Sequence, residues 1–210
     1  MVDSQLRPNG VTDARILEVM GRVPREMFVP ESRRLVAYVD EDLPLAAGPG
    51  TRYLMEPMIQ ARLIQLAHIE PDDIVLDVAC GPGYSTAVLA QLAGSVVAID
   101  DQPALVDAAN ENLSALDIGN AAAVVAELTA GMPDEAPFDA IVIGGAVEVV
   151  PPGLIAQLKQ GGRLAAVVRR GAVASATVFL KSGADTSSVI AFDANVPLLD
   201  AFARTPEFHF

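Results

Sequence analysis

Two glycines at a predicted turn between a strand and a helix are the feature of this sequence that most clearly suggests chemistry. Gly81 and Gly83 follow a short apolar segment, residues 74–79, and precede a segment of small residues. Glycine lets a ligand approach both the backbone and the N-terminus of the following helix. A second apolar segment ends in Asp100, where a carboxylate is placed to accept hydrogen bonds from both hydroxyls of a ribose. The pattern predicts a site for a cofactor that contains adenosine.

The spacing of the small residues distinguishes two kinds of cofactor. A dinucleotide site is typical of Gly-x-Gly-x-x-Gly, whereas this turn carries Ala79, Gly81 and Gly83, with Asp77 two positions before Ala79. A carboxylate at that place disfavours a pyrophosphate and suits a cationic sulfonium. The pattern acid-x-small-x-Gly-x-Gly resembles motif I of the class I S-adenosylmethionine-dependent methyltransferases. A tight turn without a ligand is the alternative for the glycines, and a solvated strand end or a helix N-cap is the alternative for the acids.

The elements that must position this turn alternate along the chain from residue 74. The early apolar segments are hydrophobic on both faces, which is typical of a parallel sheet covered by helices. The last two segments lie on either side of Ser182-Gly183, which predicts an antiparallel hairpin. The predicted strands are residues 74–79, 95–100, 121–127, 138–144, 163–169, 176–181 and 187–192, and the predicted helices are 85–93, 103–116 and 151–160. The fold class is therefore α/β, a Rossmann-like, doubly wound and mostly parallel sheet with an antiparallel last strand.

The N-terminal part of the chain differs from this core because it is rich in charge and proline. A helix is predicted over residues 11–20, with Thr12 or Asp13 as its N-cap, and another begins at Pro57. We expect one domain over residues 1–210, in which 1–56 form an N-terminal helical segment and pocket loop and 57–210 form the Rossmann-like core.

Composition narrows the classes of function. The chain has 210 residues, and its 14 basic and 27 acidic residues give a net charge of −13. Such a protein repels phosphate backbones and anionic lipid, so neither nucleic acid nor a membrane is an expected partner. A single cysteine, Cys80, fits a reducing compartment and predicts a cytoplasmic protein, and no residues have metal-ligand spacing. The only histidines, His68 and His209, disfavour a hydrolase that depends on histidine, and His68 is expected at a helix end.

A resemblance to one family extends from residue 1 to about residue 170. Residues 74–100 are similar to the cofactor motifs of the protein-L-isoaspartate O-methyltransferases, and 136–141 and 158–164 are similar to their fourth and fifth strand regions. The N-terminal matches are Gln5-Leu6, Gly10-Val11, Ile16-Leu17, Val23-Pro24-Arg25-Glu26, Phe28-Val29, Ala37-Tyr38 and Leu43-Pro44-Leu45. The resemblance implies protein repair, in which a methyl group passes from S-adenosylmethionine to the carboxylate of an isoaspartyl residue.

Two departures from the family pattern concern the acceptor and the cofactor. The family carries Gly-x-Gly-Gln-Thr-Ile-Ser-x-Pro, and alignment on Pro57 puts Met55 at its serine and Tyr53 at its threonine. Because that serine helps to hold the acceptor carboxylate, no catalytic residue is assigned. A second family motif, Gly-Asp-Gly, is Ala126-Glu127-Leu128 here; in the family its acid contacts the adenine amine, and Glu127 could still do so with a longer reach. The residues expected to hold S-adenosylmethionine are Asp77, Ala79, Cys80, Gly81, Gly83, Tyr84, Asp100, Asp101 and Glu127.

The long loop of residues 41–56 carries the candidates for a replacement acceptor site. Thr51, Arg52 and Tyr53 lie close together, and Arg52 could clamp a carboxylate with two parallel hydrogen bonds. The alternative is that Arg52 is a solvated loop residue and that residues 53–55 pack over the cofactor pocket as a hydrophobic lid. A carboxylate acceptor is already ionised at pH 7, so this chemistry needs no general base.

Three functions stay open at this point. The first is methyl transfer to isoaspartyl protein, and the second is methyl transfer to a more apolar acceptor, because Met55 replaces the serine. The third is a catalytically inactive protein that binds S-adenosylmethionine as a sensor or scaffold. The expected partner is a protein or peptide acceptor, or a small molecule, and the oligomeric state is left open. Cys80 is expected to pack in the glycine turn, since no base or cation flanks it in the sequence.

Overall fold

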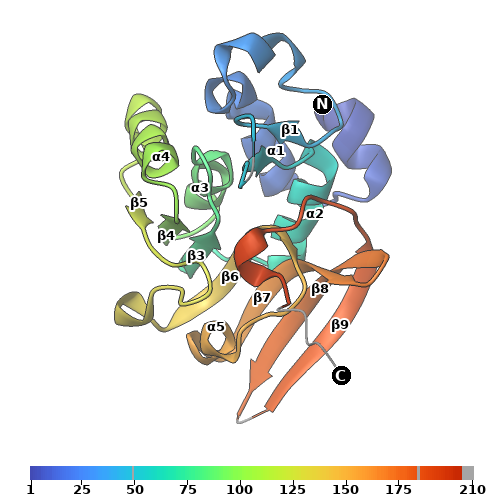
Figure 1. Cartoon of the computed structure of the whole chain (residues 1–210), viewed down its shortest axis with the longest axis vertical. Coiled ribbons are helices and arrows are strands. Elements are labelled where there is room, and N and C mark those ends of the chain that lie inside the picture. The colour runs from blue at the N-terminus through green and yellow to red at the C-terminus, as the bar shows by residue number, and fades with distance from the viewer. Residues whose placement is uncertain (49, 184, 205–210) are drawn as a thin grey trace.

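The computed structural model describes residues 1–48, 50–183 and 185–204, and within these residues the chain forms a seven-stranded sheet in the order β5-β4-β3-β6-β7-β8-β9 (Figure 1). The strands are β3 (Ile74–Val78), β4 (Ser95–Asp100), β5 (Ala121–Val125), β6 (Phe138–Val147), β7 (Leu158–Arg170), β8 (Val173–Ser182) and β9 (Asp185–Asp193). The first five are parallel, β8 is antiparallel to β7, and β9 is antiparallel to β8. The predicted α/β fold is confirmed, with two final strands that run against their neighbours.

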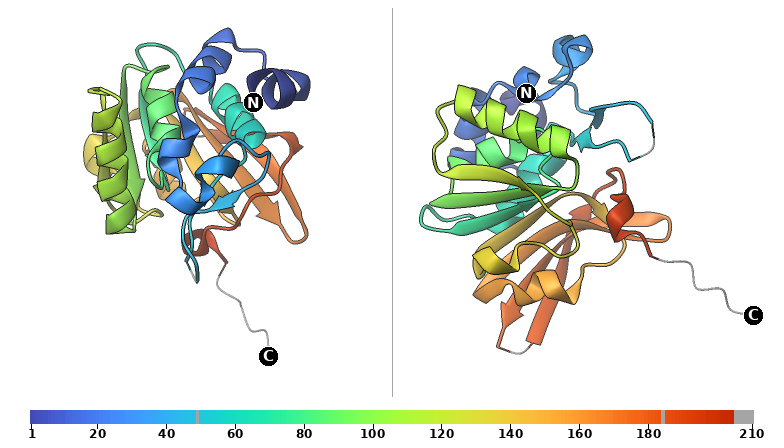
Figure 2. Two further views of the ribbon diagram at one scale, coloured as in Figure 1. Left: turned by 90° about the horizontal axis from the view of Figure 1, so that it is seen from above. Right: turned by 60° about the vertical axis from the view of Figure 1, so that its left-hand side comes forward.

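Helices cover both faces of this sheet (Figure 2). The helices are α1 (Ala14–Arg22), α2 (Pro57–Ala67), α3 (Tyr84–Ala90), α4 (Pro103–Ala115) and α5 (Pro152–Ala156). Val75 and Val142 pack in the core that α1, α2 and α3 cover, whereas Leu76 and Ile141 pack in the core that contains Leu154 of α5. This alternation follows from the period of two along a strand, and it explains why both faces of the central strands are apolar.

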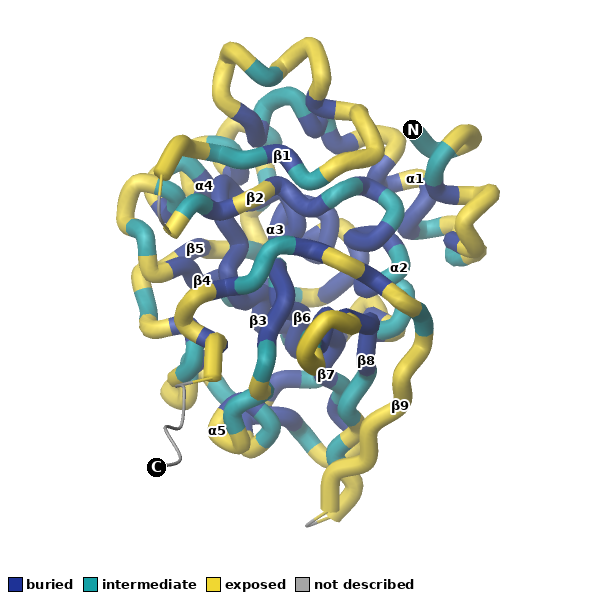
Figure 3. Tube along the Cα trace, turned by 45° about the vertical axis from the view of Figure 1, so that its right-hand side comes forward, coloured by how far each residue is buried: buried dark blue, intermediate teal, exposed yellow. Residues whose placement is uncertain are grey.

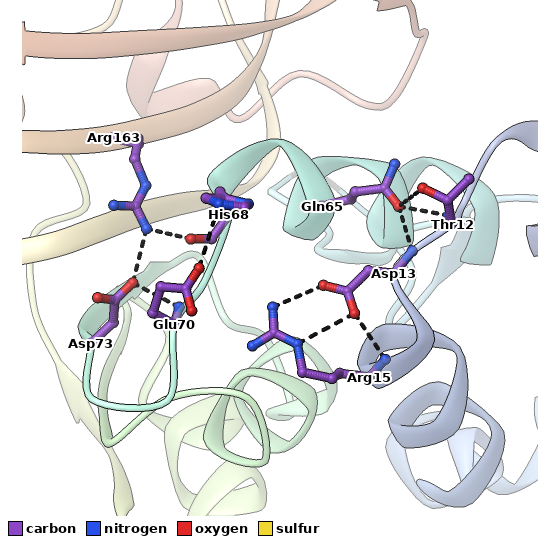
Figure 4. A network of polar contacts seen from close by, with 8 residues as sticks. All are labelled: Thr12, Asp13, Arg15, Gln65, His68, Glu70, Asp73 and Arg163. Atoms are coloured by element: carbon purple, nitrogen blue, oxygen red, sulfur yellow. Dashed lines mark hydrogen bonds and ion pairs between the residues drawn. The ribbon is translucent and has the colours of Figure 1, made fainter.

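Polar side chains fasten the N-terminal helices to the core (Figure 4). Asp13 caps α1 by accepting a hydrogen bond from the backbone N–H of Arg15 at 2.8 Å, which confirms one of the two predicted caps. The Gln65 Oε1 atom of α2 accepts from the backbone N–H of Thr12 at 2.8 Å. On the other side of α2, Arg163 donates to Asp73 at 2.9 Å. His68 ends α2 in a left-handed conformation, as expected of a helix end, while His209 lies outside the described residues.

The predicted end of one helix was wrong. The helix predicted over residues 151–160 ends at Ala156, because Leu158 pairs with Phe138 and begins β7. Long-range pairing there overrides the intrinsic preference of the segment.

The loop of residues 41–56 contains a small hairpin that the sequence did not reveal. Its strands are β1 (Leu43–Pro44) and β2 (Tyr53–Leu54), which pair antiparallel. Figure 3 shows this hairpin above the buried ends of the central strands, whereas β9 is exposed along most of its length. The hairpin therefore covers the edge of the sheet where the glycine turn lies.

Candidate functional site

The glycine turn lies where the sheet reverses its direction of winding. The chain proceeds from β3 to β4 and β5 on one side, then returns to place β6 on the other side of β3. In open α/β sheets this reversal leaves a crevice at the carboxyl ends of the strands, where ligands bind. Gly144 of β6 comes very close to the turn, because an added Cβ would lie 2.6 Å from the Ala79 carbonyl oxygen.

Backbone conformation confirms that this turn needs small residues. Gly81 has a φ of 55° and Gly83 a φ of 91°, both in the left-handed region that favours glycine. Ala79 also lies there, with a φ of 60°, which costs a residue with a Cβ more than it costs glycine. Gly83 additionally lets α3 start against α4, because an added Cβ would lie 3.2 Å from the Ala109 Cα atom.

Asp77 is a buried carboxylate with one free acceptor atom. Its Oδ2 atom accepts hydrogen bonds from the hydroxyls of Ser85, at 2.6 Å, and Thr86, at 2.7 Å. Its Oδ1 atom is buried and has no hydrogen-bond partner among the residues that the structure describes. Burial raises the pKa of Asp77 to about 6, against the lowering effect of the two hydroxyls. A cationic or N–H donor at Oδ1 would favour the ionised form.

Asp100 joins the end of β4 to the glycine turn. Its Oδ2 atom accepts from the backbone N–H of Gly81 at 3.0 Å, and its Oδ1 atom accepts from the backbone N–H of Gln102 at 3.1 Å. The side chain is fully buried, and this burial raises the pKa of the carboxyl, while nearby Arg52 opposes the shift. The two predicted acids thus lie on adjacent strands, as the sequence pattern required.

Arg52 reaches these acids from the hairpin. Its Nε atom lies 3.4 Å from Asp100 Oδ2, and a terminal nitrogen lies 2.5 Å from Asp101 Oδ1. The residue is 7% exposed, so the interpretation of Arg52 as a solvated loop residue was wrong. Asp101 pairs with Arg52, and Gln102, the residue before α4, makes no side-chain capping hydrogen bond.

A small pocket lies beside Arg52. The hairpin forms one wall, the end of β6 forms another, and a late segment that returns to β6 closes it. Its lining residues are Asp42, Thr51, Arg52, Tyr53, Met55, Gly144, Gly145, Val196, Pro197, Leu198 and Leu199. The structure therefore brings the three predicted acceptor candidates and Met55 to one cavity.

The lining of this cavity bears on the two interpretations of the loop. Met55 and Leu54 are buried, but Tyr53 is 39% exposed, so the lid interpretation fits only part of the segment. The Thr51 hydroxyl donates to the carbonyl of Gly48 at 2.5 Å. Arg52 donates from Nε to Asp100 and from one terminal nitrogen to Asp101, so this edge of the guanidinium is not free to clamp an acceptor.

Three other predicted cofactor residues have different surroundings. Cys80 is buried, and burial raises the pKa of its thiol well above the usual value, which fits a packing residue and not a nucleophile. Tyr84 is fully buried, with its ring in an edge-on contact to Phe28. Glu127 is exposed just beyond β5, where it accepts a hydrogen bond from the Thr129 hydroxyl at 2.7 Å.

Arg25 is a site-supporting residue that the sequence reasoning missed. It is fully buried, donates from Nε to the Ala37 carbonyl at 2.7 Å, and also donates to the Met55 carbonyl. Its guanidinium carbon lies 4.8 Å from the centre of the Tyr84 ring, and burial lowers its pKa. Arg25 thereby fixes the start of α2 and the segment that carries Met55. No periodicity marked this arginine, because buried arginine is recognised only by its partners.

Neither a membrane span nor a metal site is found in the described ranges. No helix among residues 1–48, 50–183 and 185–204 has the length and apolar character needed to cross a membrane. The same residues contain no group of three or more His, Cys, Asp or Glu side chains placed to hold a metal ion.

The sheet order, the glycine turn and the acids at the ends of β3 and β4 together define the class I fold of S-adenosylmethionine-dependent methyltransferases. The chain belongs to the protein-L-isoaspartate(D-aspartate) O-methyltransferase family, whose model matches residues 1–199.

Curated relatives carry the family's name. Over 168 residues the chain is 40% identical to a protein-L-isoaspartate O-methyltransferase of Methanoculleus marisnigri, covering 80% of this chain and 75% of that protein. Over 164 residues it is 43% identical to protein-L-isoaspartate O-methyltransferase 2 of an Anaeromyxobacter species, covering 78% of this chain and 66% of that protein.

Two solved structures share the fold. A protein-L-isoaspartate O-methyltransferase has a TM-score of 0.81 at 24% identity, over 90% of this chain and 62% of that one. A putative member from Plasmodium falciparum in complex with S-adenosyl-L-homocysteine has a TM-score of 0.77 at 20% identity, over 95% of this chain and 96% of that one.

Proposed function

We propose that this protein transfers a methyl group from S-adenosylmethionine to the carboxylate of isoaspartyl residues in proteins or peptides. The observation that carries the proposal is the position of two buried carboxylates, Asp77 and Asp100, beside a left-handed glycine turn. This turn lies where the sheet reverses its direction of winding. Membership of the family and relatives at about 40% identity favour this acceptor over a different one, and favour an active enzyme over an inactive cofactor-binding protein.

The residues present fit the cofactor. The buried, unpartnered Oδ1 atom of Asp77 suits a cationic amine, and the Asp100 carboxylate at the end of β4 suits ribose hydroxyls. Gly81 and Gly83 leave the backbone open to close approach, with Ala79 and Cys80 forming the rest of the turn. We assign Asp77, Asp100, Gly81 and Gly83 to cofactor binding. We place Asp101 and Glu127 at the outer rim of the cofactor site.

Tyr84 has a different role in this proposal. Its ring is buried against Phe28 and under the guanidinium of Arg25, so we assign it to holding α3 and the N-terminal segment together. In this proposal Tyr84 supports the glycine turn through its packing at the start of α3 and does not contact the cofactor.

When bound, S-adenosylmethionine supplies an electrophilic methyl group on a sulfonium. An isoaspartyl carboxylate is ionised at neutral pH, so the chain supplies no general base. What the protein contributes is alignment and exclusion of water. Gly144 and Gly145 line the pocket at the end of β6, and Met55 presents an apolar wall in place of a hydroxyl. We assign no single side-chain donor to the acceptor carboxylate, because the Thr51 hydroxyl donates its one hydrogen to the Gly48 carbonyl and Arg52 donates to Asp100 and Asp101.

The acceptor class is tested by a matched pair of peptides. Methyl transfer is measured with an isoaspartyl peptide and with the same sequence containing ordinary aspartate, and transfer to the first alone is expected. Equal transfer to both peptides, or to neither at saturating cofactor, would contradict the isoaspartyl acceptor.

Cofactor assignment is tested by calorimetry with S-adenosylhomocysteine. Asp100→Asn should weaken its binding by roughly tenfold or more, because a ribose hydroxyl would lose a charged acceptor. Asp72→Asn, on an exposed turn before β3, is the control and should bind as the parent protein does. Unchanged binding by the Asp100 variant would remove that residue from the site.

The remaining assignments are part of the same proposal. A single domain over residues 1–210 is favoured by one apolar cluster that unites residues of the N-terminal segment with residues of β3, β6 and β7. A cytoplasmic location stays a prediction from the single cysteine.

A further inference from the structure

Arg52 contacts Asp100, which the proposed function assigns to cofactor binding, and the neighbouring Asp101. Its two contacts, 3.4 Å to Asp100 and 2.5 Å to Asp101, come from the Nε atom and one terminal nitrogen of the same planar group. The Arg52 side chain is 8% exposed and that of Asp100 is fully buried, so solvent screens this pair weakly. The contact therefore ties the hairpin to the end of β4.

A second tie joins the same two segments. The Gln102 side chain, at the start of α4, donates to the Gly50 carbonyl at 2.7 Å. Within the hairpin, the Arg52 carbonyl accepts from the backbone N–H of Leu45 at 2.9 Å, so the position of Arg52 is coupled to both strands. A movement of the guanidinium would be passed to the wall of the acceptor cavity, which residues 51–53 form.

Arg52 and the hydroxyls of a bound ribose would compete for the hydrogen-bond acceptor positions of the Asp100 carboxylate. Its Oδ2 atom already accepts from Gly81 and Arg52, and its Oδ1 atom accepts from Gln102. A carboxylate offers about four acceptor positions, and two of these are taken by the backbone. A guanidinium beside the ribose site also repels a cofactor that carries a sulfonium charge.

We infer that Arg52 is a latch which the cofactor must displace from Asp100, so that loading the cofactor frees the hairpin at the wall of the acceptor cavity. This inference rests on the proposed function. The Asp101 side chain is 42% exposed and can move with the guanidinium, so the hairpin can shift while that ion pair persists. The latch makes the acceptor cavity responsive to the cofactor, and it favours binding of the cofactor before the acceptor.

Calorimetry with S-adenosylhomocysteine tests the competition without relying on turnover. Arg52→Met removes the competing donor, so this variant should bind about tenfold more tightly than the parent protein. Arg52→Lys keeps the charge but loses the planar pair of donors, so it should fall between the two. Arg7→Met removes one positive charge from an exposed pair with Asp3 and should bind as the parent does.

Hydrogen exchange of residues 50–54 gives a second readout. In the parent protein S-adenosylhomocysteine should speed exchange in this segment, against the usual protective effect of a ligand. In Arg52→Met the segment should exchange fast both with and without the ligand.

The outcomes separate the latch from the proposed function. If the parent protein does not bind S-adenosylhomocysteine, both are overturned. If the parent binds and Arg52→Met binds equally or more weakly, the latch is overturned and the proposed function stands. Slower or unchanged exchange in residues 50–54 of the parent on binding also overturns the latch.

Discussion

Two acidic side chains, Asp42 and Glu56, lie at or next to the wall of the acceptor pocket. Asp42 lines the cavity, and its Oδ1 atom accepts from the backbone N–H of Glu56 at 2.9 Å. Burial, together with the charges of Asp42 and Asp40, raises the pKa of Glu56 to about 7. Burial likewise raises the pKa of Asp42. These groups become charged as the pH rises, and negative charge there opposes an acceptor that is itself a carboxylate.

The Glu56 carboxyl also has a definite effect on stability. Because its pKa is raised on folding, the folded state binds more protons than the unfolded state between about pH 4.5 and pH 7, so the free energy of unfolding falls as the pH rises through that window. Glu56→Gln should remove this fall and leave the variant more stable by about 1 kcal/mol at pH 8, a value discounted for solvent screening. Urea unfolding at pH 5 and pH 8 measures the difference, with Glu111→Gln, at an exposed position of α4, as the control. A parent protein with the same pH slope as the Glu56 variant would contradict the assignment.

At the scale of elements, the approach of β6 to the glycine turn decides whether the site can form. Gly144→Ala would place a Cβ 2.6 Å from the Ala79 carbonyl, against backbone that cannot move freely. We expect a loss of about 1–3 kcal/mol in the free energy of unfolding and weaker binding of S-adenosylhomocysteine. Gly119→Ala, which meets no atom within 4 Å, is the matched control for chemical denaturation and calorimetry. A Gly144 variant as stable as that control would show that the two segments can separate without cost.

The core elements could be predicted from the sequence because their local signals agree with the fold. Strand β4 was predicted with its observed bounds, and β3 and α4 within one residue, since apolar runs and Pro103 mark them. The β1–β2 hairpin could not be, because strands of two residues leave no periodic pattern, and the shortened α5 could not be, because it depends on the pairing of Leu158 with Phe138. Asp77 and Asp100 were found by their place at strand ends. The partners of Arg52 and the role of Arg25 depend on tertiary contacts that no spacing encodes.

For the whole molecule, the net charge of −13 governs encounter with a polypeptide acceptor. An isoaspartyl peptide with flanking lysines should show a lower KM than one with flanking glutamates, because the field of the protein attracts the first and repels the second. The difference should shrink as salt rises from about 0.01 M to 1 M, where the Debye length falls from about 30 Å to 3 Å. Initial rates over this salt range provide the measurement. A difference that does not depend on salt would point to direct contacts in the cavity.

Cys80, the one thiol in the sequence, is buried within the glycine turn and is therefore a built-in reporter. A maleimide can reach the sulfur only when the turn opens, so the labelling rate of the unmodified protein measures how often its cofactor loop unfolds locally. No engineered label is needed, and the protein carries no other cysteine to confuse the signal. The same position makes the thiol slow to oxidise while the fold is intact, so storage without reductant should modify mainly molecules whose turn has already come apart.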